Sequence, residues 1–452
     1  MPYKKRYHFY RGYFAWLQSL SQGFESRILW ILGIAQIFQE TCPPKTKNHS
    51  TKNQEQKKHA HPQLQKLHKQ QKPHKLKKPL LLQLKSNHRK MGPLQGIKII
   101  EMGGLGPAPF AGMMLADMGA EVILVERKAS ANKVRVPDCN RRGKRCIAIN
   151  LKTPEGIETL LKLVEKADVL FEGFRPDVME RLGIGPDVCM ARNPRLIYGR
   201  MTGWGQSGPL AKSAGHDINY ISLSGALHAI GRKGEKPVVP LNLVGDYGGG
   251  SMFLIVGILA ALLEAKTSGK GQIVDAAMTD GSAMLMNIFH SLQAMGQWTT
   301  ERGANWIDGG AHFYDTYETK EGKYISIGPL EPQFYALLRQ KLALSEEEFG
   351  AQFNPKLWET QTVKLAAMFK TKTQQEWCEL LEGTDVCFAP VLNYIEATQH
   401  PHNLARKTFI EVDGIQQAAP APRFSRTVSE VQFGSHAAGE DTDDILRDWG
   451  IG

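Results

Sequence analysis

Between residues 97 and 278, short apolar runs alternate with glycine-containing turns and helical segments. The first unit predicts a strand at Ile97 to Met102, a glycine- and proline-rich turn, a helix through Met118, and a strand at Glu121 to Glu126. The same pattern predicts further strands at residues 146–151, 168–171, 196–201 and 272–278. Strands separated by helices in this rhythm form parallel sheets covered on both faces. The sequence therefore predicts an α/β fold built on a large, Rossmann-like parallel sheet.

One helix in this series has clear start signals. Thr153 is a favourable N-cap residue, and Pro154 follows it at the first helical position. The next apolar residues have the spacing of one buried helix face, at Ile157, Leu160, Leu161 and Val164.

The pattern of apolar and charged residues changes after about residue 300. Tyr324 to Ile327 is strand-like, and residues 332–400 are mainly charged, amphipathic helices. This predicts a second, smaller α+β domain. We expect a basic extension over 1–90, a large domain over 91–290, a small domain over 291–405, and a segment over 406–452 that returns to the large domain.

The basic charge of the chain is concentrated in its first 90 residues. They contain 19 of the 56 Lys and Arg but only 3 of the 45 Asp and Glu, so the chain of net charge +11 carries −5 from residue 91 onward. Residues 43–90 are low in complexity and are predicted to be disordered, because they bury too little apolar surface. We interpret the extension as a solvated presequence or a non-native upstream segment, with an RNA- or lipid-binding tail as the alternative.

The sequence argues against several classes of protein. The longest apolar run, Ile28 to Phe38, is shorter than the roughly 18–20 residues of a spanning helix, so we expect no membrane span. None of the six cysteines forms a C-x-x-C pair or has zinc-finger spacing to a histidine pair. We therefore expect no disulfide framework, no metal site and no redox cofactor. Because the body is acidic, we also expect no nucleic-acid partner.

The first strand–turn–helix unit superficially resembles a dinucleotide-binding fingerprint. The turn Gly104-Leu105-Gly106-Pro107-Ala108-Pro109 has proline where the third glycine should permit close helix–strand packing. Arg127, which follows Glu126 at the next strand end, suits a phosphate on a ribose, as in NADP or in the 3′-phosphoadenosine of coenzyme A. Arg127 equally suits a solvent-exposed strand end.

Several segments resemble the family of α-methylacyl-CoA racemases and class III (CaiB/BaiF-type) CoA-transferases. They are Gly104 to Phe110, Ala116 to Val122, Glu172 to Pro176, Arg200 to Pro209 and Gly269 to Asp275. The resemblance covers residues 91–452 and implies a CoA-binding fold, with acyl-CoA as substrate rather than a separate cofactor. It also implies an interlocked homodimer whose active sites lie between the large domain of one subunit and the small domain of the other. These motifs do not distinguish racemases from transferases.

Three acid–base residues favour the racemases. The segment Ala214 to Tyr220 resembles the racemase motif with its catalytic histidine, here His216. Leu243 to Gly250 carries Asp246, which resembles a proton-transfer base in racemases and the acyl-accepting nucleophile in transferases. Gly328 to Phe334 resembles the motif whose glutamate, here Glu331, bonds the histidine. Taken alone, His216 suits a core histidine, Asp246 an N-cap, and Glu331 first-turn charge at a helix start.

The resemblance also indicates CoA-binding positions. Arg127 resembles the arginine at the nucleotide, and the strand end bordering the adenine is matched by Ile149, Asn150, Leu151 and Lys152. The loop that borders the thioester is matched by Gly215, His216, Asp217, Ile218, Asn219 and Tyr220. Arg175 and Arg181 are candidate phosphate partners, with salt bridges as the alternative.

The resulting functional hypothesis is a racemase of lipid or fatty acid metabolism. It would interconvert (2R)- and (2S)-2-methylacyl-CoA by proton transfer through an enolate, because inversion next to a thioester needs an acid/base group on each face. The alternative is a class III CoA-transferase that forms an acyl anhydride on Asp246. A third hypothesis, a non-enzymatic nucleic-acid binder, predicts salt-sensitive binding that is lost without residues 1–90. We expect a cytoplasmic enzyme, or a mitochondrial one if the extension is a presequence.

Overall fold

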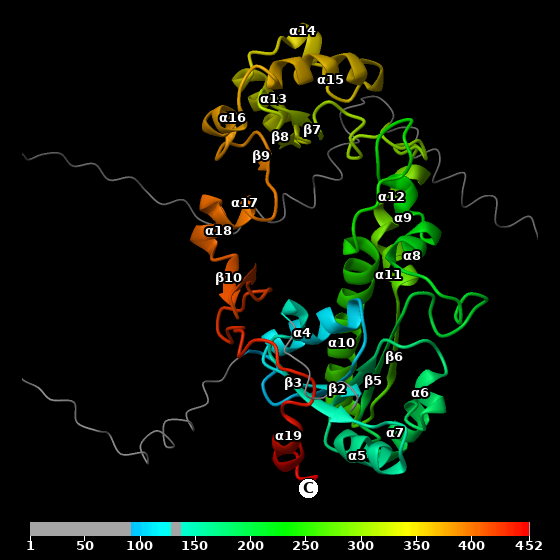
Figure 1. Ribbon diagram of the computed structural model, residues 1–452. Helices are drawn as coiled ribbons and strands as arrows, with labels where there is room; N and C mark the ends of the chain where they lie inside the picture. Colours follow the sequence, from blue (N-terminus) through cyan, green and yellow to red (C-terminus); the bar gives the residue numbers. More distant parts are fainter. Residues whose placement is uncertain (1–91, 128–136, 452) are drawn as a thin grey trace, which may run out of the picture. The chain divides into compact units, whose positions relative to one another are not determined.

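The computed structural model describes residues 92–127 and 137–451, so the interpretation of residues 1–90 lies outside the described residues. Its main feature is a six-stranded sheet in the order β3-β2-β1-β4-β5-β6, in which all neighbours are parallel (Figure 1). The strands are β1 (Lys98–Met102), β2 (Glu121–Arg127), β3 (Lys144–Ile149), β4 (Val169–Glu172), β5 (Ile197–Thr202) and β6 (Ile273–Ala277). The predicted parallel α/β sheet is confirmed, with all six predicted strands in place.

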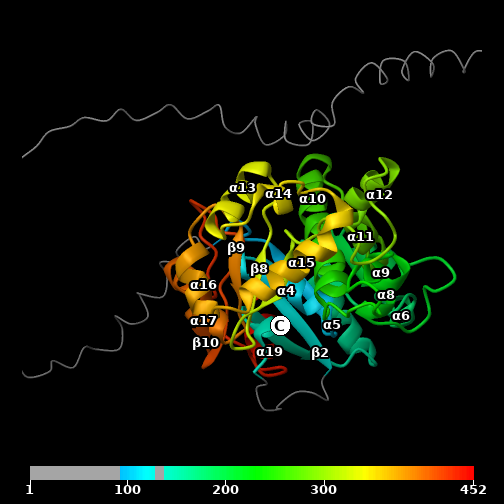
Figure 2. The same ribbon diagram turned by 90° about the horizontal axis from the view of Figure 1, so that it is seen from above.

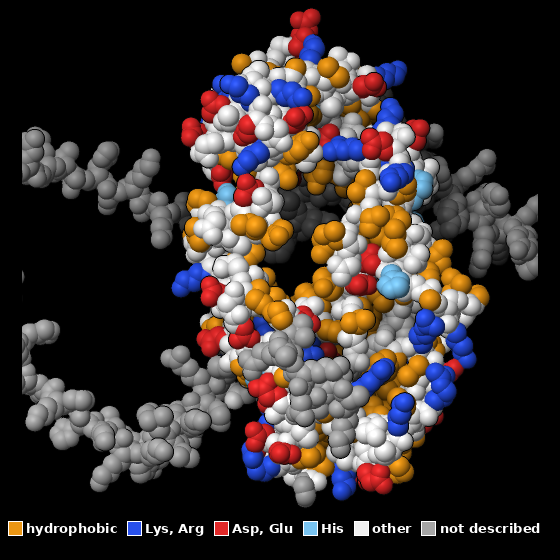
Figure 3. Space-filling model, in the orientation of Figure 1, with side chains coloured by type: hydrophobic (Ala, Val, Ile, Leu, Met, Phe, Trp, Pro, Cys, Tyr) orange, Lys and Arg blue, Asp and Glu red, His pale blue; other side chains and the backbone are white. Residues whose placement is uncertain are grey.

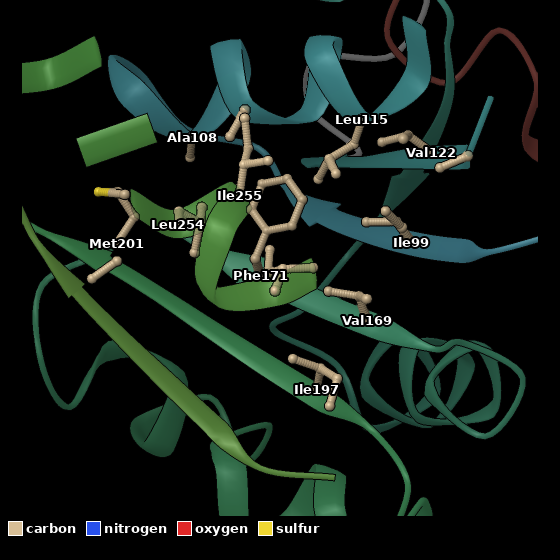
Figure 4. Packing of buried hydrophobic residues seen from close by; sticks show 14 of the residues in the cluster. Ile99, Ala108, Leu115, Val122, Val169, Phe171, Ile197, Met201, Leu254 and Ile255 are labelled. Carbon is tan, nitrogen blue, oxygen red and sulfur yellow. The ribbon is translucent and has the colours of Figure 1, made fainter. Parts of the chain in front are cut away.

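Two hydrophobic cores cover the two faces of this sheet. Successive strand residues point to opposite faces, so Ile99 packs in one core and Ile100 in the other. The first core is closed by Leu115 of α4 and Leu254 of α10 (Figure 4). The helices linked to the sheet are α4 (Pro107–Asp117), α5 (Pro154–Val164), α6 (Val178–Arg181), α7 (Pro186–Arg192), α8 (Asp217–Leu223), α9 (Ala226–Ala229), α10 (Met252–Ser268), α11 (Met278–Leu285) and α12 (Asn287–Ala294), with a 3-10 turn η3 (Cys139–Arg141).

Helix α5 begins as its sequence predicts. The Thr153 side chain accepts a hydrogen bond from the Gly156 N–H at 3.2 Å, and Pro154 occupies the first turn. The face formed by Leu160, Leu161 and Val164 is buried against the sheet.

The helix that precedes β6 differs from its prediction. The sequence predicts a long apolar helix over Met252 to Leu263, whereas the helix begins earlier, with a π-helical segment, η4 (Leu243–Ser251), and continues through α10. Close packing of glycines explains the segment: a Cβ on Gly281 of α11 would meet the Gly249 carbonyl oxygen at 1.8 Å. Only glycine permits such an approach.

One described helix, the continuous Leu243–Ser268, has the length and apolar composition of a membrane-spanning segment. Its 26 residues, with a mean hydropathy of 1.8 in the best window, are long and apolar enough by these two criteria, alone among the described helices. Soluble core helices pass the same test, and 44% of the window is buried in the protein.

A second unit with its own core follows the large sheet. The antiparallel strands β7 (Asp315–Glu318), β8 (Tyr324–Ile327) and β9 (Phe388–Val391) pack with α13 (Pro332–Lys341), α14 (Glu346–Phe349), α15 (Pro355–Phe369) and α16 (Gln374–Leu381). Then come α17 (Glu396–Gln399), α18 (Pro401–Arg406), the hairpin β10 (Phe409–Val412) and β11 (Ile415–Ala418), and α19 (Thr442–Asp448). Ile445 and Trp449 pack in the core of the large sheet, so the chain end returns to it.

Candidate active site

The candidate site lies beyond the carboxyl ends of β1 and β4. The strand order changes direction between these two strands, and ligands of open parallel sheets bind at such a switch point. After β1, Gly106 has a φ of 75° and begins α4. After β4, a Cβ on Gly173 would lie 3.3 Å from the Ala108 side chain, so the loop after β4 packs closely on the start of α4.

His216 is the N-cap residue of α8 at this edge. Its N–H donates to the Asn219 side-chain oxygen at 3.0 Å, while its own side chain is exposed. Tyr220 anchors the loop. Its hydroxyl donates a hydrogen bond to the Gly215 carbonyl, and its ring packs edge-to-face on Trp204 with the ring centroids 4.8 Å apart. Helices α8, α9 and α11 lie side by side in both views (Figures 1 and 2). The loop therefore holds the histidine at a fixed place while leaving its ring accessible.

Asp246 is half-buried in η4 and faces the same loop. Its carboxylate accepts a hydrogen bond from the Asn242 side-chain amide at 3.2 Å. Its backbone N–H donates to the Asp217 carboxylate at 2.7 Å, and its carbonyl accepts from Ser251 at 3.1 Å. A Cβ on Gly106 would lie 3.5 Å from the Asp246 carboxylate, so the acid also lies beside the start of α4.

The surroundings raise the pKa of the Asp246 carboxyl above its usual range. Burial is the main cause; the Asn242 hydrogen bond opposes it, the negative charge of Asp217 adds to it, and His216 lowers the pKa again. The structure therefore brings Asp246 and His216 within electrostatic reach of each other. A half-buried carboxyl group beside an accessible imidazole provides two groups that can move protons.

Glu331 does not join this pair within one chain. It is the N-cap residue of α13, whose buried Tyr335 and Leu338 belong to the core of the second unit. Its charge raises the pKa of Cys387, after the larger effect of burial, and Cys387 lines a cleft of about 650 Å³ beside β8 and β9. The structure thus brings together two of the three predicted acid–base residues.

The predicted nucleotide-binding positions lie close together. Arg127 pairs with Ile149 in the sheet register, at the carboxyl ends of β2 and β3, so the segment Asn150 to Lys152 follows directly beside Arg127. Asn150 and Lys152 are exposed.

The three predicted phosphate partners are exposed arginines. Within the described part of the chain, Arg127, Arg175 and Arg181 make no ion pair, which leaves their charges available to a ligand. The charge of Arg175 lowers the pKa of Tyr220, although burial and Asp246 raise it overall, so Arg175 also lies near the thioester loop. Glu126, by contrast, is held by Arg141 at 2.8 Å.

Sequence reasoning missed the residues that hold Asp246 in place. Asn242 stands four residues before it, a helical spacing that places the two side chains on one face. The hydroxyl of Ser251 also donates to the Pro107 carbonyl at 2.7 Å, which joins η4 to α4. The sequence could not predict that the Asp217 carboxylate points towards the Asp246 N–H, because this contact depends on how η4 packs on α8.

We predict that Gly245→Ala will disturb this arrangement. A Cβ at residue 245 would lie 2.6 Å from the Asp217 carboxylate, which already contacts the next N–H, so the substitution should cost about 1–3 kcal/mol of stability and reduce activity. Thermal unfolding and steady-state kinetics measure both effects. Gly104→Ala is the matched control, because its Cβ would approach no atom closer than 3.8 Å. Equal behaviour of the two variants would contradict the prediction.

Known proteins resemble this chain over most of its length. A family model described as CoA-transferase family III matches residues 94–442. A mouse protein named alpha-methylacyl-CoA racemase is 45% identical over 361 residues, which cover 79% of this chain and 93% of the relative. A human succinyl-CoA:glutarate CoA-transferase is 27% identical over 385 residues, covering 80% and 87%. The crystal structure of a CAIB/BAIF family protein from Brucella suis matches with a TM-score of 0.68 and 25% identity, covering 79% of this chain and all of that one.

Proposed function

This chain belongs to CoA-transferase family III, and from that premise we propose that it is a racemase of 2-methylacyl-CoA thioesters. The observation that carries the proposal is that His216 and Asp246 lie within electrostatic reach of each other, with Asp217, the neighbour of His216, accepting a hydrogen bond from the Asp246 N–H. The 45% identity to the mouse racemase supports the same assignment.

The proposed reaction is a proton transfer between two faces of one carbon. One group takes the C2 proton, the electron pair of the C–H bond moves into the thioester as an enolate, and the other group returns a proton to the opposite face. Histidine suits this task because both of its forms exist near neutrality. Asp246 suits it because its half-buried carboxyl group lies within reach of His216, and burial raises its pKa above the ordinary value. Backbone N–H groups near Asp217 would stabilise the enolate oxygen.

The CoA part of the substrate would lie along the carboxyl edge of the sheet. Arg127 would meet the phosphate on the ribose, and Ile149 to Lys152 would border the adenine. Arg175, exposed and near Tyr220, would meet a phosphate between the nucleotide and the thioester. Arg181 is a further exposed cation on the neighbouring α6.

The proposal includes a homodimer in which Glu331 of a second subunit orients the imidazole of His216. Two observations support it: Glu331 belongs to a different core in its own chain, and large apolar side chains are exposed on α10 to α12. Figure 3 shows such side chains gathered where Figure 1 draws these helices. The exposed residues are Met252, Val256, Leu263, Met284, Leu285 and Ile288. Exposed apolar surface of this kind marks interfaces.

We therefore predict that Val256→Glu will weaken self-association and reduce racemisation together. A charge placed at this position, 61% exposed in one chain, would have to be buried when a second copy covers α10. Sedimentation velocity measures the association. Val363→Glu on α15, at a similarly exposed valine, is the control. A wild-type monomer would contradict the homodimer, and a Val256→Glu dimer as stable as the wild type would contradict an interface over α10.

A CoA-transferase is the second candidate. It is favoured by the human CoA-transferase relative and by Asp246, an acid that a transferase would use as its nucleophile. In that reaction the Asp246 carboxylate attacks the thioester carbonyl, CoA leaves as the thiolate, and an acyl anhydride forms. It requires a free carboxylic acid as acceptor, and it does not require His216.

The deciding experiment exposes one epimer of a 2-methylacyl-CoA to the purified full chain in D₂O. We expect deuterium at C2 and the appearance of both epimers, followed by NMR and mass spectrometry. A chain that exchanges no C2 proton, but transfers CoA once a free carboxylic acid is added, would overturn the racemase proposal in favour of the transferase.

A further inference from the structure

Asp217 is a buried acid that has no cationic partner among the described residues. Four acidic side chains are buried in the described part of the chain. Three of them contact a cation: Glu101 with Lys144, Asp117 with Arg142 and Glu172 with Arg200.

The fourth, Asp217, is 6% exposed and makes no ion pair within the described residues. Of its two oxygens, Oδ2 accepts the Asp246 N–H at 2.7 Å, and the buried Oδ1 has no hydrogen-bond partner in the described structure. An unpaired buried carboxylate is costly, and such costly groups are retained where they serve a function.

Its position connects the two proposed acid–base groups. Asp217 follows His216 directly and begins α8, while its carboxylate accepts a hydrogen bond from the backbone N–H of Asp246. Gly245 leaves room for this contact, because any Cβ there would overlap Oδ2. A movement of the Asp217 side chain would therefore move Asp246 relative to His216.

We propose that Asp217 is a positioning residue for Asp246: its buried carboxylate fixes the Asp246 amide and thereby the position of the Asp246 side chain relative to His216. The inference rests on the proposed racemase function and assigns the Asp217 side chain a role that involves no contact with the substrate. Displacement of a reacting group by about 1 Å can reduce a rate by about 10²-fold, so a small loss of alignment is expected to be measurable.

The charge of Asp217 affects the pKa of Asp246, which a pH–rate profile can detect. The negative charge of Asp217 raises the pKa of Asp246, beyond the larger effect of burial. Of the side chains on neighbouring elements, His216, Asp217 and Tyr220 interact with Asp246. The charged or titratable side chains on the elements packed against η4 are those of Asp117, Tyr198, Arg200, His216, Asp217, Tyr220, Glu264, Lys266, Asp275 and Asp280.

The test is Asp217→Asn in the full chain, which removes the charge but keeps the size and a hydrogen-bond acceptor. We expect kcat for epimer interconversion to fall about 10-fold with KM for the thioester unchanged, and the acidic limb of the pH–rate profile to move to lower pH. The melting temperature should not fall, because an unpaired buried charge is removed. Asp217→Ala, which also removes the acceptor, should reduce kcat further. Asp187→Asn, an exposed acid on α7, is the control.

Two failures can be told apart. Wild-type protein that exchanges no C2 proton would overturn the racemase function and this inference together. Wild-type exchange combined with an Asp217→Asn profile that keeps its acidic limb would overturn the inference alone. A lower melting temperature with an unmoved pH profile would assign Asp217 a purely structural role.

Discussion

His216→Ala is expected to lower the rate of epimer interconversion by about 10²–10⁴-fold, the usual contribution of a general acid or base. The imidazole is the accessible member of the pair, whereas the other titratable group at the α8 N-terminus, Asp217, is buried. KM for the thioester should change much less, because the side chain acts on the reacting proton rather than on the nucleotide.

The same variant should separate exchange from inversion. Without His216, only Asp246 can remove a C2 proton, so one epimer should still exchange with D₂O while neither epimer inverts. Asp246 is only half-buried, so its proton can exchange with solvent before it returns to the same face. Asp246→Asn should give the mirror result, with exchange of the opposite epimer alone. Following the two epimers separately by NMR thus assigns a face to each residue.

His402→Ala provides the matched control, because His402 is an exposed histidine on α18. Its rates should equal those of the wild type. If His216→Ala retained full interconversion, the two-residue mechanism would be wrong. If it retained CoA transfer to a free acid while Asp246→Asn lost it, Asp246 would instead be a nucleophile.

The sheet was predictable because its signals are local. Each strand is a short apolar run. In β1, for example, Ile99 and Ile100 supply apolar side chains to opposite faces of the sheet, and this does not depend on which strand lies next to β1. Thr153 and Pro154 likewise specify the start of α5 within a few residues of chain. The π-helical segment η4 was not predictable, because it depends on contact between Gly249 and Gly281 from separate helices.

The site was predictable only as far as family motifs reach. His216 and Asp246 lie together as the resemblance implies, whereas Glu331 lies on a separate core in the same chain. The Asp217 contact depends on the register of two helices, which neither periodicity nor spacing encodes. The domain boundaries, the acyl-chain preference and the cytoplasmic location stay predictions.

Another feature without a sequence signal is the ion pair between Glu101 and Lys144. Their strands, β1 and β3, are separated by β2, so the pair exists only once the strand order is formed. The two charged atoms lie 2.5 Å apart, and both side chains are fully buried. Lys144 also donates to the Pro109 carbonyl of α4 at 2.8 Å. Burial raises the pKa of Glu101 to about 7, although Lys144 opposes the rise.

Lys144→Met should therefore destabilise the fold by about 3–5 kcal/mol, because it leaves Glu101 buried without its cation. The loss should be smaller at pH 5 than at pH 8. Glu101 has a folded-state pKa above its ordinary value, so the folded chain binds the extra proton and loses stability as pH rises. Removing the cation raises this pKa further and steepens the loss. Urea unfolding at both pH values, at one protein concentration, measures it.

Two further variants test whether the unpaired charge is the cause. Glu101→Met combined with Lys144→Met removes both charges, so it should recover most of the stability and flatten the pH dependence, since an apolar pair of similar volume can replace a buried ion pair. Arg192→Met breaks exposed pairs with Glu158 and Glu165 and should cost less than about 1 kcal/mol. A double variant no more stable than Lys144→Met would show that the loss comes from packing and from the Pro109 contact. In that case α4, whose first residues adjoin Asp246, would depend on the lysine itself rather than on the neutralised acid.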